Sequence, residues 1–171
     1  ASLSMRAVDR GVSLFARAQA QAADLLRSLD SNSSAAVILI GARPVPLLPA
    51  LSRNIAALHE ALSAARPTLE RGDPAGALAL AGRMLEGSGE IFIFGDFQRT
   101  NWGAVDFSGS KGTATFLRPV TERDVENVGI TGIEKSPQEP IEGETVELTC
   151  TVFNSTPGKR IEKVRLDMAK V

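Results

Sequence analysis

The sequence predicts an α/β fold with two parts: a doubly wound, mostly parallel sheet over residues 1–120 and a partial antiparallel immunoglobulin-like β segment over residues 121–171. The first 120 residues hold 22 of the 23 alanines, whereas the last 51 hold one alanine and 16 residues of Val, Ile and Thr. Alanine favours helices, and β-branched residues favour strands. In the first part, helical stripes also alternate with short apolar runs, as in a sheet covered by helices on both faces. We expect the boundary in a polar linker, Thr121 to Asn127.

The first half of the α/β part predicts a helix followed by two strands. Apolar residues recur at steps of three and four and form one helical stripe: Phe15, Ala18, Ala22, Leu25, Leu26 and Leu29. Residues 35–40 (AAVILI) form a continuous apolar run, which is typical of a strand buried on both faces. Residues 44–48 predict an edge strand, where proline is tolerated.

The second half predicts two more helices and two strands. A stripe from Ile55 to Ala65 predicts the second helix, which Pro67 would end. Asp73 is the expected N-cap of a third helix that continues to about Glu86, with Pro74 at its first position. Residues 91–94 (IFIF) and 114–117 predict the remaining strands.

The β-rich part shows clean alternation. Val146, Leu148, Cys150 and Val152 would share one face of a strand, so we expect Cys150 to be buried. Residues 164–168 repeat the pattern after a turn, and residues 128–133 predict a further strand. These strands resemble the first ones of an immunoglobulin-like sandwich, which needs about seven strands. We therefore expect this chain to be part of a longer protein.

Composition excludes several classes of function. A net charge of −1 provides no general attraction to nucleic acid or acidic membranes. The single Cys cannot form an internal disulfide, and the single His excludes zinc sites with several histidines. The longest apolar run, residues 35–42, is too short to span a bilayer. The remaining candidate ligands for a metal ion are therefore mostly oxygen atoms.

Candidate ligands fall at two places that this fold would bring together. Asp96 directly follows the predicted strand at residues 91–94, and ligands of open α/β sheets bind at the carboxyl ends of strands. Ser2 and Ser4 alternate with apolar residues just before the first helix, so an extended segment would direct both hydroxyls to one side. Two hydroxyls and one carboxylate suit a hard cation such as Mg²⁺.

Taken together, these residues resemble the von Willebrand factor type A domain. Its metal-ion-dependent adhesion site uses an Asp-x-Ser-x-Ser motif, a distal Thr and a distal Asp. Ser2 and Ser4 match the two serines and Asp96 the distal aspartate, while the leading Asp would fall one position before Ala1. Three stretches are similar to bacterial membrane-anchored, aerotolerance-type members: SLFARAQAQAADLLRSL, RPTLERGDPAGALALA and FGDFQRTNWG. Thr68 is the candidate for the distal Thr, although the family's usual spacing falls on Gly72 and Asp73.

The resemblance implies a protein–protein interaction module without catalytic activity. Ser2 and Ser4 would bind Mg²⁺ or another divalent cation directly, Thr68 directly or through water, and Asp96 through waters. A carboxylate of a partner protein would complete the coordination, at least in the full-length protein. The resemblance places such a domain on the extracytoplasmic face of a bacterial membrane, attached through segments outside this chain.

The sequence lacks the strand that precedes the Asp-x-Ser-x-Ser motif in the family, and this leads to a further expectation. Two alternative functions are also open. In the family the first strand is central, and without it the strands at 35–40 and 91–94 would lose a shared neighbour. Strand exchange or a homo-oligomer could fill this gap. One alternative function is a metal-independent scaffold with a degenerate site. Another is a phosphoryl-transfer or hydrolytic enzyme that uses Asp96, which would need a second catalytic group.

Overall fold

The computed structural model describes residues 3–68, 70–107, 112–121, 128–139, 141, 143, 145–154, 158–159, 161 and 163–164. The chain divides into two compact units, Ala1–Val125 and Glu126–Val171. No helix among the described residues has the length and apolarity that a membrane crossing requires.

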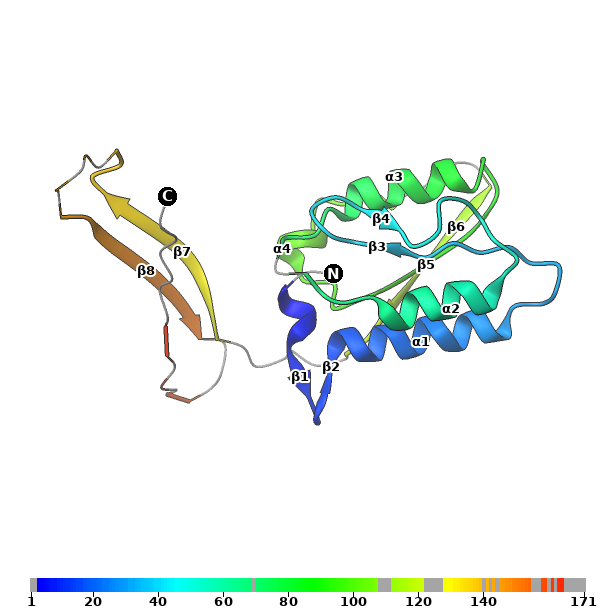
Figure 1. Ribbon diagram of the computed structural model, residues 1–171, viewed down its shortest axis with the longest axis horizontal. Coiled ribbons are helices and arrows are strands. Elements are labelled where there is room, and N and C mark those ends of the chain that lie inside the picture. Colours follow the sequence, from blue (N-terminus) through cyan, green and yellow to red (C-terminus); the bar gives the residue numbers. More distant parts are fainter. Residues whose placement is uncertain are drawn as a thin grey trace. The chain divides into compact units, whose positions relative to one another are not determined.

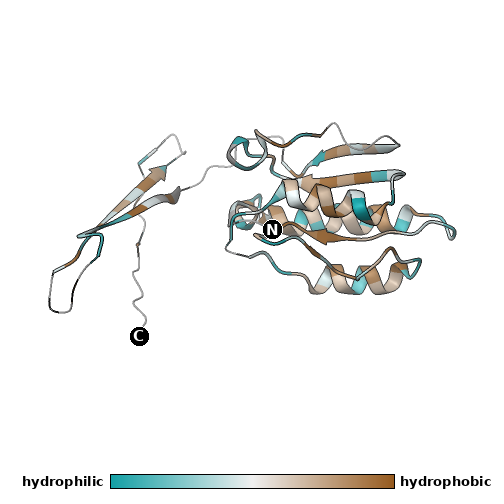
Figure 2. Ribbon diagram, turned by 90° about the horizontal axis from the view of Figure 1, so that it is seen from above, coloured by the Kyte–Doolittle hydropathy of each residue, from teal (hydrophilic) through white to brown (hydrophobic). Residues whose placement is uncertain are grey.

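The first unit alternates helices with short strands (Figure 1). Its elements are η1 (Leu3–Arg6), β1 (Val8–Asp9), β2 (Val12–Ser13), α1 (Leu14–Ser28), β3 (Ile38–Leu39), β4 (Val45–Pro46), α2 (Ile55–Ala64), α3 (Pro74–Met84), β5 (Gly89–Gly95), α4 (Arg99–Trp102) and β6 (Thr113–Pro119). Helices α1 and α2 pack together on one side of the strands, and α3 lies on the other side. Figure 2 shows hydrophobic colour along strands of this unit, although Ile93 and Gly95 of β5 are the only buried residues among its described strand residues.

The strands of the first unit pair two by two. β5 and β6 are parallel, with Gly89 opposite Thr113 and Gly95 opposite Pro119. β3 and β4 are antiparallel, and so are β1 and β2. The described residues do not join these pairs into one sheet. The doubly wound sheet therefore stays a prediction, with β5–β6 as its parallel element.

Local hydrogen bonds explain where the helices begin. The Ser13 hydroxyl accepts from the Ala16 N–H (3.1 Å) and begins α1. The predicted cap of α3 is confirmed, because Asp73 accepts from the Gly76 N–H (2.9 Å) and Pro74 takes the first helical position. The helix ends at Met84, two residues before the predicted end.

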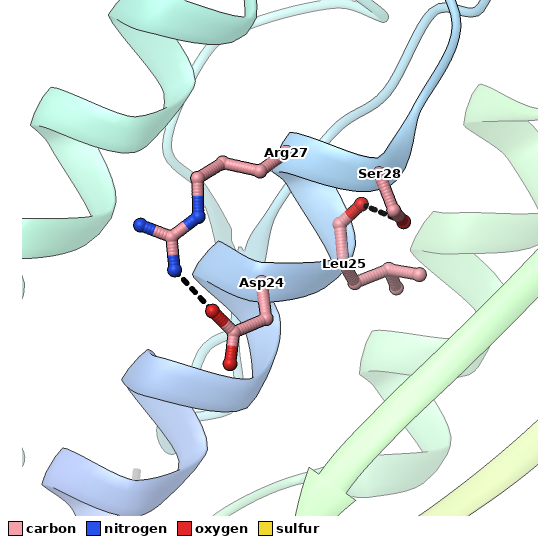
Figure 3. Close-up of polar contacts among 4 residues, drawn as sticks. All are labelled: Asp24, Leu25, Arg27 and Ser28. Atoms are coloured by element: carbon pink, nitrogen blue, oxygen red, sulfur yellow. Dashed lines mark hydrogen bonds and ion pairs between the residues drawn. The ribbon is translucent and has the colours of Figure 1, made fainter.

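The last turn of α1 carries its own polar contacts on the surface (Figure 3). The Arg27 guanidinium pairs with the Asp24 carboxylate, and the Ser28 hydroxyl donates to the Leu25 carbonyl oxygen (2.7 Å). Exposed pairs of this kind contribute only a few tenths of a kcal/mol, about 0.3–0.5. The helix is therefore held in place by its apolar face rather than by these contacts.

Two clusters of buried side chains form the core of the first unit. One contains Met5, Leu14, Phe15, Ala65 and Val120. The other contains Leu26, Leu58 and Leu62 and joins α1 to α2. The Gln19 side-chain amide of α1 donates to the carbonyls of Leu62 (2.8 Å) and Ala65 (3.1 Å) at the end of α2, so a polar contact reinforces the same packing.

The β1–β2 hairpin was not predicted from the sequence. Arg10 (φ 52°) and Gly11 (φ 79°) form its two-residue turn, and two positive φ angles are typical of a type I′ turn. The Arg17 guanidinium pairs with the Asp9 carboxylate (2.8 Å) and ties the hairpin to α1. The hairpin thus fixes how η1 approaches the helical layer.

The second unit contains an antiparallel pair, β7 (Val128–Ser136) and β8 (Glu147–Asn154), with a register shift between Ile130 and Gly132. Every β8 residue is exposed. The prediction that Cys150 is buried is therefore wrong, because no described element covers the face on which it lies. Most of the strand predicted at residues 164–168 lies outside the described residues, and the immunoglobulin-like fold stays a prediction.

Candidate functional site

Asp96 lies at the carboxyl end of β5, as the sequence predicts. The Val120 N–H donates to the Gly95 carbonyl (3.1 Å) and holds this strand end against the residue after β6. Phe97 then adopts a positive φ of 47°, so the chain turns sharply immediately after Asp96. The Asp96 side chain is half-buried, and its Oδ2 atom is inaccessible to water and has no hydrogen-bond partner among the described residues. Because most buried polar atoms in proteins are hydrogen-bonded, this oxygen is a candidate position for a ligand or a bound water.

An aromatic cluster adjoins the Asp96 turn. The rings of Phe97 and Trp102 lie 5.0 Å apart, and those of Trp102 and Phe107 lie 6.1 Å apart and nearly parallel. Trp102 is half-buried and belongs to α4. Aromatic pairs of this kind contribute about 0.5–1.5 kcal/mol each, so the cluster stabilises the segment that follows Asp96.

Ser4 lies in η1, which packs against α1. Its neighbour Met5 is only 5% exposed and contributes to the core cluster on which Leu39 of β3 and Phe94 of β5 pack. Met5 and Asp96 also line the same cavity. The Ala7 N–H donates to the Ser4 carbonyl (3.0 Å), which closes the turn of η1.

Thr68 lies beside the chain that follows β3. Its Oγ1 atom is 4.0 Å from the position that a Cβ atom on Gly41 would occupy, and its side chain is exposed. The Asp73 N–H donates to the Gly41 carbonyl (2.8 Å), which holds the start of α3 against the same segment. Thr68 is therefore near the end of β3, while Asp96 follows the end of β5.

The positions that compete with Thr68 have structural roles. The Asp73 carboxylate caps α3. A Cβ atom on Gly72 would lie 3.2 Å from Ile40 Cγ2 and 3.3 Å from the Ile40 carbonyl oxygen, so this position is filled by close packing. The choice of Thr68 as the ligand therefore stays a prediction. Ser2 lies outside the described residues.

The candidate set is rich in hydroxyls and contains one carboxylate. Accordingly, the described residues form no group of three or more His, Cys, Asp or Glu side chains suited to a metal ion. Ser4, Thr68 and Asp96 would offer oxygen atoms only, which suits Mg²⁺ better than zinc or copper. Because two of these groups are neutral, they would leave most of the charge of a bound cation available to a further anion.

A cavity of about 510 Å³ lies in the first unit, and its lining includes Asp96 but neither Ser4 nor Thr68. Residues of α1, α3, β3 and β5 line it, and Asp96 and Met5 are among them. Glu90, near the start of β5, is also part of the lining. Sequence reasoning did not identify this cavity as a site, because periodicity predicts which faces are apolar but not which of them meet.

Comparison with protein-family models, curated proteins and solved structures finds no match to this chain.

Proposed function

We propose that this chain is a protein–protein interaction module in which a divalent cation, best Mg²⁺, bridges to a carboxylate of a partner protein. The observation that carries the proposal is the buried Asp96 Oδ2 atom without a hydrogen-bond partner among the described residues. Leaving such a group unsatisfied costs about 1–3 kcal/mol, or more if it is charged. A cation, or a water bound to one, would remove this cost.

The roles follow from the chemistry of each side chain. Ser4 and Thr68 would supply neutral hydroxyl ligands, and Asp96 would hold waters of the cation or bind it directly. Ser2 belongs to the same proposal through the resemblance to type A domains. With only one carboxylate in the set, the cation keeps a net positive charge and attracts the acidic side chain of a partner. Binding rather than catalysis follows, because the proposed set contains no second acid or base that could move a proton.

The resemblance to bacterial membrane-anchored type A domains extends the proposal to location. We propose that the module acts on the extracytoplasmic face of a bacterial membrane, where a domain of this kind meets partner proteins. The anchor would lie in segments outside this chain.

Calorimetric titration of the chain with Mg²⁺, after dialysis against EDTA, tests the cation site. We expect measurable heat and a higher melting temperature in Mg²⁺, because a ligand that binds only the folded state stabilises it. Asp96→Asn should abolish both responses. Glu60→Gln, which alters an exposed carboxylate on α2, is the matched control and should keep both.

A second titration tests the bridge to a partner. Acetate at a fixed Mg²⁺ concentration should strengthen the apparent binding of the cation if an outside carboxylate completes its shell. Equal heats in wild type and Asp96→Asn would contradict the site, and so would an absence of heat in every variant. An Mg²⁺ response that acetate leaves unchanged would retain the site and reject the bridge.

A metal-independent assembly scaffold is the alternative, and the second unit favours it. The described pair β7–β8 exposes large apolar side chains, among them Ile133 and Phe153, each 61% exposed. An isolated two-stranded ladder is marginally stable in water, so these faces would gain stability against another surface. This scaffold predicts self-association that is unchanged by EDTA and reduced by Phe153→Glu, as measured by light scattering.

A further inference from the structure

A smaller pocket, of about 330 Å³, is lined by residues of η1, of the start of α1 and of the segment that follows α2. Its charged lining residues are Arg6 and Arg66, and among the described residues no Asp or Glu lines it. Both arginines are exposed, so their guanidinium groups are accessible from outside. Because arginine keeps its charge at every physiological pH, this pocket attracts anions.

Hydrogen bonds hold the guanidinium of Arg66 at the end of α2. Its Nη1 atom donates to the carbonyl oxygens of Ser63 and Ala65, both at 2.9 Å. The hydrogens on Nε and Nη2 have no partner among the described residues. These two nitrogens form the edge of a guanidinium that can donate two parallel hydrogen bonds to one carboxylate. Arg66 is therefore held in place with a carboxylate-binding edge unused.

The other polar groups of the pocket are also available to an anion. The Arg6 side chain has no hydrogen bond or ion pair in the described part of the chain. Asp9, the nearest carboxylate in sequence, pairs with Arg17 instead (2.8 Å). The Ser13 hydroxyl accepts from the Ala16 N–H and keeps its own hydrogen as a donor. The pocket thus offers donors of positive or neutral charge and no competing carboxylate.

The chain places this pocket beside two of the proposed cation ligands. Arg6 follows Ser4 by two residues, and Arg66 precedes Thr68 by two residues. Two residues span at most about 7 Å of chain, so one short segment of a partner could reach both places. The positive charge of the arginines opposes a nearby cation but favours a second anion next to it.

We propose that this pocket binds an acidic side chain of the partner protein, next to the carboxylate that the cation would bind. The inference rests on the proposed function for the first carboxylate, whereas the pocket itself requires no cation. Alternate residues of an extended segment point to the same side, roughly 7 Å apart. The partner segment would therefore carry two acidic residues separated by one other residue.

Two peptides test this inference. The first, acetyl-Ala-Glu-Ala-Glu-Ala-amide, carries both acidic groups, and the second, acetyl-Ala-Glu-Ala-Gln-Ala-amide, carries one. By calorimetry at fixed Mg²⁺ and constant ionic strength, we expect the first to bind at least fivefold more tightly, because its second carboxylate reaches a charge-assisted hydrogen-bonding site. In EDTA both peptides should shift the NMR signal of the Arg66 Nε–H, since one glutamate is enough to occupy the pocket.

Variants of the arginines separate recognition from a loss of structure. Arg6→Gln should remove the fivefold preference and leave the affinity for Mg²⁺ alone equal or higher, because a repulsive charge is lost. A merely structural defect would weaken both. Arg66→Gln should also remove the preference, although it loses the contacts at the end of α2 as well. Arg53→Gln alters an exposed arginine before α2, outside the pocket, and as the matched control should keep the preference.

Three results would overturn the proposal. The first is equal binding of the two peptides in Mg²⁺ together with no shift of the Arg66 signal. The second is an unchanged preference in Arg6→Gln. The third is tighter binding of inorganic phosphate than of the diacidic peptide in Mg²⁺, which would assign the pocket to a free phosphate group. Absence of heat with Mg²⁺, with the Arg66 shift retained in EDTA, would reject the cation site and retain the pocket as a site for an acidic side chain.

Discussion

Replacing Leu58 by alanine tests the packing that holds α1 and α2 on one side of the strands. Leu58 is fully buried, at 0% exposed, and forms a cluster with Leu26 and Leu62. Removing a buried leucine side chain loses its transfer free energy and leaves a cavity, at a cost of 2–5 kcal/mol in well-packed cores. Leu58 has no exposed surface through which water could refill its site. We therefore expect Leu58→Ala to lower the free energy of unfolding by about 3 kcal/mol.

Urea unfolding monitored by tryptophan fluorescence measures this loss in the first unit alone, because Trp102 is the only tryptophan of the chain. For a unit of this size the expected loss corresponds to a melting temperature about 12 °C lower. Leu51→Ala is the matched control: Leu51 is 37% exposed, and its truncation should cost less than about 1 kcal/mol. A Leu58→Ala protein as stable as the Leu51→Ala protein would refute the assigned α1–α2 packing.

Three further predictions concern single side chains. Asp73→Ala removes the cap of α3 and should lower the free energy of unfolding by about 1 kcal/mol, with Asp73→Asn as the conservative control in urea unfolding. Gly112→Ala combines a positive φ of 92° with a Cβ atom 2.6 Å from the Gly87 carbonyl oxygen, so it should cost at least 1–3 kcal/mol by the same assay, roughly the cost of one strained residue. The Ser33 hydroxyl, followed by the backbone N–H groups of Asn32 and Ser33, lowers the pKa of Asp30 below its ordinary value, so Asp30 should contribute stability at neutral pH that is lost as the pH falls through its lowered, folded-state pKa. NMR titration should show a higher Asp30 pKa in Ser33→Ala, and an unchanged value would contradict the role of that hydroxyl.

Part of the candidate site depends on residues close together in the chain and could be predicted from the sequence. The rest depends on residues far apart in the chain and could not. Asp96 could be placed from the sequence because it directly follows an apolar run of strand length. The surroundings of Ser4 could not, because its neighbour Met5 belongs to a core cluster with residues as distant in the chain as Val120. Thr68 could not be distinguished from Gly72 and Asp73 by spacing, and the structure adds only that Asp73 caps α3 and that Gly72 packs closely on Ile40.

The sequence alone determined the elements whose formation depends on residues close together in the chain. The stripe from Phe15 to Leu29 and the Asp73–Pro74 start of α3 depend on interactions within three or four positions, which a linear pattern records. Tertiary structure alone decided the exposure of Cys150 and the enclosure of one cavity by residues of α1, α3, β3 and β5. The physical reason is that alternation shows which side chains share a face of a strand, whereas burial of that face requires a second layer supplied by distant residues.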